Sequence, residues 1–186
     1  MIELPEITKA WMAGFFDGEG TIFIERDSPR PLKGKLSPRY LLRVAAVNTV
    51  YSALEPFRTY FGGQLVETKL GTNRPLYAWS TRSKIAMKFL EALLPYLRVK
   101  QKQAELGIFF QKKLRHHGGN APMPQAYLAE RERIRQAIQE LNMGWPTPTV
   151  IDVSPQDMQL PLIAGDTEES IFEALGLKYI PPEARE

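Results

Sequence analysis

The residues with the clearest chemical potential lie in WMAGFFDGEGTIFIER, residues 11–26, where an apolar helical pattern ends at the acid Glu19 and a strand-like pattern follows. The chain has no cysteine, and its two histidines are adjacent. These counts exclude thiolate zinc sites and leave too few ligands for a tetrahedral zinc site. A metal in this protein would therefore be held by carboxylates. Their oxygens suit hard cations such as Mg²⁺, and Glu19 is the first candidate ligand.

Small residues precede this acid on the expected helix. Ala13 and Gly14, with Gly18 further along, leave room for a second helix to approach backbone to backbone. If that helix belongs to a second copy of the chain, a two-fold axis brings Glu19 close to its own copy. Two carboxylates at such a distance repel each other unless cations lie between them, and the negative ends of both helix dipoles add to the attraction for Mg²⁺. A two-fold pair of acids with cations suits two scissile phosphates.

The distribution of charge along the chain is uneven. Residues 1–118 hold 19 Lys and Arg against 10 Asp and Glu, a net charge of +9, whereas residues 119–186 hold 5 against 11, a net charge of −6. A basic region with interspersed aromatic residues is expected for a protein that binds a polyanion such as nucleic acid. The alternative is a basic surface that only confers solubility, and charge alone does not decide between the two.

Alternating and helical patterns define the elements that must hold these residues. The expected elements are a helix at 7–16, strands at 20–27 and 39–47, a helix at 50–61, strands at 63–70 and 75–81, and helices at 83–96, 100–114 and 127–141. Up to residue 114 the order is helix, two strands, helix, two strands, helices. This order predicts an α+β fold in which helices cover one face of a single sheet.

Length and composition predict one globular domain with an appendage. The 186 residues are 44% hydrophobic, which is enough for a core. No apolar run reaches the roughly 18 residues that a membrane helix needs, and the start lacks the basic segment of a signal peptide. We therefore expect an intracellular protein, not secreted and without a membrane partner. The composition changes near residue 143, which predicts one domain at 1–142 and a Pro-rich acidic C-terminal extension at 143–186.

MAGFFDGEG, residues 12–20, resembles the LAGLIDADG motif of homing endonucleases, with Glu19 at the position of the last acid of the motif. FGG at 61–63 and LRVKQKQAEL at 97–106 extend the similarity, which covers roughly residues 1–142. The resemblance implies the fold of that family, an αββαββα core with a four-stranded antiparallel sheet shaped as a saddle, and extra C-terminal helices. A single motif implies a homodimer. The interface would include Trp11, Ala13, Gly14, Asp17 and Gly18.

The same resemblance implies the catalytic residues. Glu19 would bind the metal, with the main chain of Gly18 nearby, and Asp17 would hydrogen-bond at the helix end. Lys100 would stabilise developing phosphate charge or polarise water, although it could also be a solvated lysine at a helix start. Asn48, at the end of the second strand, would orient solvent.

The activity implied is that of a Mg²⁺-dependent DNA endonuclease. It would break both strands of a long, nearly palindromic duplex across the minor groove and leave 3′ overhangs, and its gene would be intron-encoded and mobile. One departure from the family concerns the first turn of the second helix, where Val50, Tyr51 and Ser52 replace the usual Arg or Lys. We expect this departure to affect the turnover rate rather than the reaction.

The sheet face opposite the helices should read the major groove, because a twisted antiparallel sheet can present side chains to base edges. Alternation selects these candidates: Thr21, Phe23, Glu25, Arg39, Arg43, Glu67, Lys69 and Arg74. Arginines would favour guanine and glutamates cytosine, while Lys33 and Lys35 would contact phosphates. Any one of these residues could instead be a solvated strand residue.

Three other interpretations fit parts of the sequence. Glu67 and Lys69 form the ExK pattern of another nuclease fold, but such a site also needs an aspartate at the end of a neighbouring strand, and the triplet is common by chance. HHGGN at 116–120 suits a surface loop better than a histidine nuclease site. The serious alternative is a protein of the same fold that binds DNA as a regulator, or RNA as an intron maturase, without cutting.

The end of the chain, PLIAGDTEESIFEALGLKYIPPEARE at 161–186, resembles a segment of bacterial family X DNA polymerases. It contains none of the catalytic acids of the polymerase, so no polymerase activity is inferred. An endonuclease gene within or beside a polymerase gene would explain the similarity. The alternative is an unrelated acidic helix with a Pro-rich end.

Overall fold

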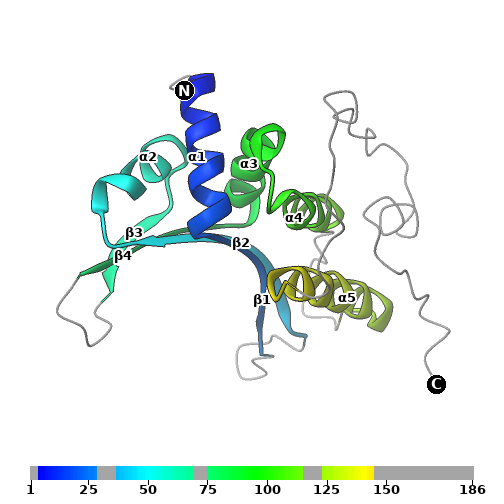
Figure 1. Ribbon diagram of the computed structural model, residues 1–186. Coiled ribbons are helices and arrows are strands. Elements are labelled where there is room, and N and C mark those ends of the chain that lie inside the picture. The colour runs from blue at the N-terminus through cyan, green and yellow to red at the C-terminus, as the bar shows by residue number, and fades with distance from the viewer. Residues whose placement is uncertain (1–3, 29–36, 69–74, 115–122, 145–186) are drawn as a thin grey trace. The chain divides into compact units, whose positions relative to one another are not determined.

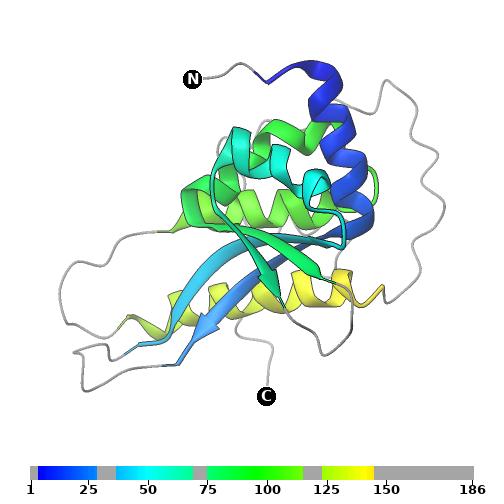
Figure 2. The same cartoon turned by 90° about the vertical axis from the view of Figure 1, so that its left-hand side faces the viewer.

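The computed structural model describes residues 4–28, 37–68, 75–114 and 123–144. Their elements, in chain order, are α1 (Glu6–Glu19), β1 (Gly20–Asp27), β2 (Arg39–Asn48), α2 (Tyr51–Phe61), β3 (Gln64–Thr68), β4 (Leu76–Arg82), α3 (Ser83–Leu93), the 3₁₀-helix η2 (Leu94–Tyr96), α4 (Gln101–Lys113) and α5 (Gln125–Asn142). Figures 1 and 2 show the helices gathered on one side of the sheet.

The sheet has four antiparallel strands in the order β1-β2-β4-β3. Side chains of successive strand residues point to opposite faces, so the register assigns each residue to one face. Ile22 pairs with Val44, and Ala46 pairs with Trp79; all four side chains are buried and lie on the helix-covered face. The side chains on the other face, called the open face below, are exposed or partly exposed, except that of Leu41, which is buried.

Aromatic rings fill the core between α1, α2, α3 and β4. Phe57 lies 5.1 Å from Trp79 and 5.9 Å from Phe89 between ring centroids, and Phe16 lies 4.9 Å from Phe89. Tilted and edge-on rings at these distances stabilise a core beyond the burial of their area. This cluster fixes α1 above the sheet.

The turn between α2 and β3 depends on glycine. Gly63 has a φ of +90°, and a Cβ there would lie 2.6 Å from the carbonyl oxygen of Ser80. Both conditions exclude a larger residue. The carbonyl oxygen of Gly62 accepts a hydrogen bond from Nε1 of the buried Trp79 at 2.8 Å. The FGG sequence therefore lets α2 end close against β4.

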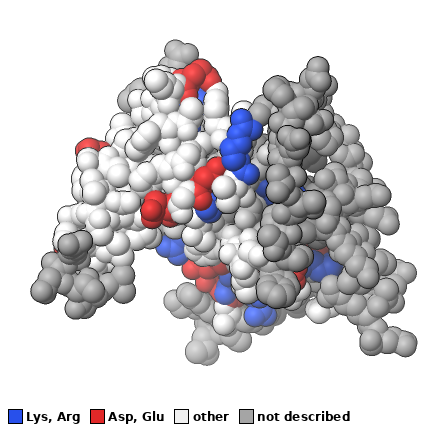
Figure 3. All heavy atoms as spheres, in the orientation of Figure 1, with Lys and Arg blue, Asp and Glu red and all other residues white. Residues whose placement is uncertain are grey.

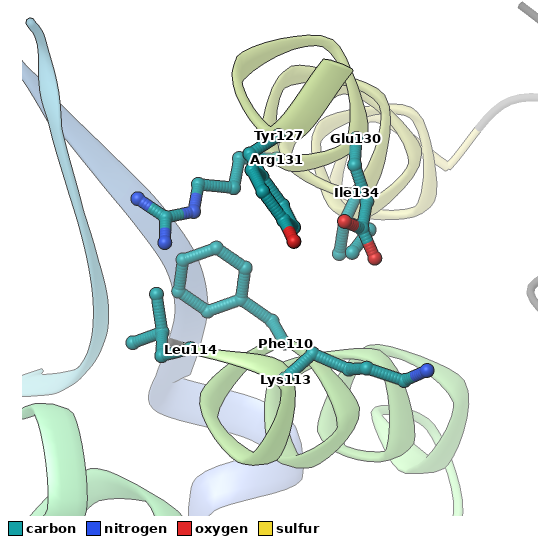
Figure 4. A pocket seen from close by; sticks show the side chains of 7 residues that line it. All are labelled: Phe110, Lys113, Leu114, Tyr127, Glu130, Arg131 and Ile134. Carbon is teal, nitrogen blue, oxygen red and sulfur yellow. The ribbon is translucent and has the colours of Figure 1, made fainter. Parts of the chain in front are cut away.

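The helix α5 packs on the rest of the domain through α4 and β1. Ile134, Ala137 and Ile138 are buried along its inner side. Figure 4 shows side chains of α5, among them Tyr127 and Arg131, reaching toward Phe110 of α4 around a pocket of about 10 Å³. Such a volume holds about one water molecule, so α4 and α5 are closely packed.

The predicted order of elements and the α+β class with a four-stranded antiparallel sheet are confirmed. The first helix runs on to Glu19 instead of ending near residue 16, and the helix expected at 83–96 ends as the 3₁₀-helix η2, where Pro95 cannot donate a backbone hydrogen bond. None of the helices in the described ranges is long and apolar enough to cross a bilayer. The described elements all belong to one unit, Met1–Trp145, and the boundary placed after residue 142 stays a prediction.

Candidate active site

Glu19 is the last residue of α1 and its side chain is exposed. The helix ends because the next residue, Gly20, already has extended backbone angles, while its N–H still donates to the carbonyl oxygen of Phe16. Gly20 begins β1 and pairs with Ala46 of β2. The change from helix to strand therefore presents the Glu19 carboxylate at the end of the sheet.

Hydrogen bonds tie the segment before α4 to the end of α1. The carboxylate of Asp17 accepts bonds from the backbone N–H of Arg98 at 2.7 Å and of Lys100 at 2.9 Å. The Nζ of Lys100 donates to the carbonyl oxygen of Asp17. Asp17 thus has the helix-end role expected for it, and it brings Lys100 to the same corner of the molecule as Glu19.

The ammonium group of Lys100 is half-buried at this corner. Burial lowers the pKa of Lys100 from its ordinary 10.5, while the nearby carboxylates of Asp17 and Glu19 act in the opposite direction and raise it. Desolvation is the largest cause, so the net pKa is lowered. A lysine in this state can place positive charge beside a phosphate and can also exchange a proton more readily than a solvated lysine.

The donors at this corner suit a hard cation, but one chain supplies an incomplete set. Within the described ranges, no group of three or more Asp, Glu, His or Cys side chains is placed to hold a metal. One exposed carboxylate, that of Glu19, and backbone oxygens such as that of Gly18 are available here. Mg²⁺ usually keeps only one or two protein carboxylates and takes other oxygens from waters and phosphates. The residues therefore fit a cation that a nucleic acid or a second copy of the chain helps to bind.

Asn48 is the last residue of β2, the second residue beyond Ala46, which pairs with Gly20. It therefore lies at the same end of the sheet as Glu19. Its Oδ1 accepts a hydrogen bond from the backbone N–H of Val50 at 2.9 Å. This bond forms the turn that leads into α2, a structural role that the sequence did not suggest.

An uncharged stripe runs along the exposed side of α1. Ile7 is 81% exposed and Trp11 46%, and a Cβ placed on Gly14 or Gly18 would meet no atom of the described residues within 4 Å beyond its chain neighbours and the nearby backbone of α1. Figure 3 shows that the surface over α1 and α2 carries few charged side chains. The prediction that Ala13 lies in the dimer interface is wrong, because its side chain is fully buried in the chain's own core. Adjacent helical residues point about 100° apart, so Ala13 and Gly14 cannot share one face.

The register places most of the expected reading residues on the open face of the sheet. Those placed there are Thr21, Phe23, Glu25, Arg39 and Arg43. The prediction that Glu67 lies on the open face is wrong. Glu67 pairs with Tyr77, and its side chain is on the same face of the sheet as that of Trp79. Apolar Leu65 and Val66 are adjacent, so the pattern of this strand was ambiguous by one residue, and a shift of one residue reverses the face. Lys33, Lys35, Lys69 and Arg74 lie outside the described residues.

Arg43 is held in one orientation on the open face. Its Nη2 donates to Oγ of Ser80 at 3.3 Å, and its Nη1 lies 3.6 Å from Oε1 of Glu25. Its guanidinium carbon lies 5.7 Å from the centroid of the Phe23 ring. Ser80 and Arg82 of β4 are on the same face, and sequence reasoning missed both. The alternation of the apolar Tyr77 and Trp79 with Ser80 and Arg82 is the sequence signal that could have found them.

Two family models match the chain. A model described as LAGLIDADG endonuclease matches residues 12–112, and a model described as DNA polymerase beta thumb matches residues 128–186. No curated protein matches the chain significantly.

Solved structures resemble the whole described domain. The homing endonuclease I-CvuI in complex with the I-CreI target superposes with a TM-score of 0.61 at 19% identity, over 94% of this chain and 98% of that chain. I-CvuI with its target Sro1.3 gives a TM-score of 0.58 at 19% identity, over 93% and 97% of the two chains. The LAGLIDADG homing endonuclease I-GzeII in complex with its DNA target gives 0.52 at 17% identity, over 78% and 53%. At these identities the likeness shows a shared fold.

Proposed function

Since the chain belongs to the LAGLIDADG endonuclease family, whose model covers more than half of it, we propose that it is a site-specific DNA endonuclease that works as a homodimer. It breaks both strands of a long, nearly palindromic duplex across the minor groove and leaves 3′ overhangs. Its gene is proposed to be intron-encoded and mobile, and a DNA substrate implies that it acts inside a cell, in a prokaryote or an organelle.

One observation carries this proposal: the exposed Glu19 carboxylate and the half-buried Lys100 lie at one corner, at the end of the helix that bears the uncharged stripe. A two-fold contact along this stripe brings two such corners together. Each corner then serves one strand of a duplex. The arrangement gives a role to residues that a purely structural helix would not need.

The chain's own residues would act on the phosphate as follows. Glu19 and the main chain of Gly18 would hold Mg²⁺, which when bound supplies positive charge next to the scissile phosphate. Lys100 would place its ammonium group beside the phosphate oxygens, where charge develops in the transition state. Asp17 keeps Lys100 there through the bonds described above. Asn48, whose Oδ1 is engaged in the turn, would orient solvent with its amide nitrogen.

The open face of the sheet is the proposed DNA-binding surface. Arg43, oriented by Glu25 and Ser80, would read a guanine, and exposed Arg39 and Arg82 would add positive charge nearby. The structures of I-CvuI and I-GzeII described above are complexes with DNA targets, which supports the use of this fold for DNA binding. Gln64, Val66 and Thr68 replace Glu67 in the proposed reading set, because they alternate onto the open face.

Selection of cleaved sites from a randomised DNA library in the presence of Mg²⁺ tests the proposal. We expect a single long, nearly palindromic consensus for the unmodified protein and no cleaved products for Glu19→Gln, because the amide has the same shape but cannot balance cation charge. Glu55→Gln, which removes an exposed carboxylate on α2, should cleave normally. A protein that binds the selected site but never cuts it would support the regulator or maturase alternative.

A further inference from the structure

The helix α5 lies outside the part of the chain that matches the endonuclease family model. The match to the endonuclease model ends at residue 112, and the match to the polymerase thumb model begins at residue 128, inside α5. Figures 1 and 2 show α5 running alongside the β1–β2 hairpin. The position of α5 raises the question of what a thumb-like segment does for an endonuclease domain.

Three polar contacts join this region to the hairpin at points along its length. At the outer end, the backbone N–H of Met123 donates to Oγ of Ser37 at 2.8 Å. At the inner end, Nδ2 of Asn142 donates to the carbonyl oxygen of Ile22 at 2.8 Å. The third contact lies between them and centres on Glu132.

Glu132 collects donors from both strands of the hairpin and from its own helix. Tyr40 on β2 donates its hydroxyl to Oε2 of Glu132 at 2.7 Å, and Arg26 on β1 donates from Nε to the Tyr40 hydroxyl at 3.1 Å. Arg26 also lies 3.7 Å from Oε2 of Glu132 as an ion pair. On α5 itself, Arg135 donates to Oε1 of Glu132 at 2.6 Å and 3.0 Å. These bonds are charge-assisted and partly shielded from water, so each is stronger than a neutral bond.

The network fixes residues that alternate with the proposed reading residues. Arg26 and Tyr40 are cross-strand partners on the helix-covered face. Their chain neighbours Glu25 and Arg39 point to the open face. Because a strand residue and its neighbour share one backbone, holding one side chain against α5 limits the movement of the next side chain at the DNA-binding surface.

We propose that α5, supplied by the thumb-like segment, is a brace that positions the outer half of the β1–β2 hairpin for DNA reading, with Glu132 as its central positioning residue. The outer half comprises residues 24–27 and 39–42. The proposal rests on the proposed function of the open face, because it names what holds that face in place. It predicts that the thumb-like segment contributes to site selection without contacting DNA through α5.

Hydrogen–deuterium exchange of the full chain without DNA tests the brace directly. Glu132→Ala removes the carboxylate that joins both strands to α5, and Glu140→Ala on the same helix is the matched control, because Glu140 is exposed. We expect amides of residues 24–27 and 39–42 to exchange about tenfold faster in Glu132→Ala, as loss of charge-assisted hydrogen bonds predicts, with no change in β3 and β4. Equal exchange in the two variants would overturn the proposal.

A milder variant covers the case in which Glu132→Ala loosens the whole domain. Tyr40→Phe removes only the hydroxyl that links Arg26 to Glu132. We expect faster exchange at the same residues as in Glu132→Ala, with a smaller increase. If both variants instead speed exchange uniformly over the sheet, α5 is an ordinary core helix and the brace is rejected.

Site selection provides the second arm. With the cleaved-site library, Glu132→Ala should lose base preference at the outer positions of the consensus and keep it near the centre, while the cleavage rate of the best site at saturating protein stays within about twofold of the unmodified value. Uniform loss at every position, or none, contradicts the brace. If the unmodified protein cleaves no site, the proposed function fails, while the exchange measurement still decides the brace.

Discussion

Two parts of the molecule hold functional side chains in place by different means. At the corner of α1, the carboxylate of Asp17 binds backbone N–H groups of Arg98 and Lys100, so the geometry depends on one side chain and on main-chain donors. At the hairpin, Glu132 binds the side chains of Tyr40, Arg26 and Arg135, all of which can be changed singly. The difference indicates that the backbone geometry of the catalytic corner depends mainly on Asp17, whereas the support of the reading surface can be altered one residue at a time.

The catalytic corner should show the largest single effect. Lys100→Met keeps an unbranched side chain, one atom shorter, and removes the charge beside the phosphate, so single-turnover cleavage of the selected site should fall by about a hundredfold or more. Site binding should stay within about threefold, because the backbone bond from Lys100 to Asp17 remains. The control is Lys84→Met, an exposed lysine on α3. Unchanged cleavage by Lys100→Met would remove Lys100 from the mechanism.

The stripe on α1 offers the next test, because it separates assembly from folding. Gly14→Leu adds a side chain where the isolated chain has open space, so the fold of one chain should be preserved. If two α1 helices meet here, the added bulk should weaken the dimer by about 1–3 kcal/mol, as overpacking typically does, and cleavage should fall with it. Sedimentation and thermal unfolding distinguish the two effects. If Gly14→Leu forms a normal dimer, this side of α1 is not the interface. The control is Thr59→Leu, which adds the same side chain on the exposed side of α2.

The hairpin network should respond to acid. The hydrogen bond from Arg135 is the main reason that the pKa of Glu132 lies below its ordinary 4.5, and Tyr40 and Arg26 also lower it. A carboxyl whose pKa is lowered on folding stabilises the folded state above its ordinary pKa and loses that contribution as the pH falls through the lowered value. Tyr40 has a raised pKa and stays neutral throughout this range.

The melting temperature measures this contribution. At pH 7 the melting temperature of Glu132→Ala should lie about 2–4 °C below that of the unmodified protein, as the loss of about 1 kcal/mol would give for a chain of this length. The difference should shrink as the pH falls below about 4.5, where Glu132 begins to take up a proton in the unfolded state. A difference that stays constant to pH 3 would mean that Glu132 stabilises the fold by something other than its charge.

Sequence patterns predicted the core elements well and the side-chain surroundings less well. The motif predicted a helix before Glu19 and a strand after it, because glycine spacing and alternation are local signals, although the helix runs three residues further than its apolar pattern. It could not show that Ala13 faces the core, since that depends on which side of α1 packs on the sheet. Glu67 was placed on the wrong face because Leu65 and Val66 allow two registers. The two bonds that Asp17 accepts from residues 98 and 100 and the contacts of Glu132 join distant segments, and a single sequence carries no signal for such pairs.

The smallest effect is expected from removing the chain beyond α5. Residues 143–186 hold 2 Lys and Arg against 8 Asp and Glu, a net charge of −6, so phosphate should repel them. A chain that ends after Asn142 keeps the bond from Asn142 to Ile22 and the whole Glu132 network. It should cleave the same site, with affinity equal to that of the full chain or slightly higher at low salt.

A chain that ends after Leu114 lacks α5 and should lose stability and outer base preference together. Thermal unfolding and site selection for the three lengths decide the point: if the chain ending at Asn142 folds normally but no longer recognises its site, the acidic extension takes part in DNA binding, contrary to the charge argument.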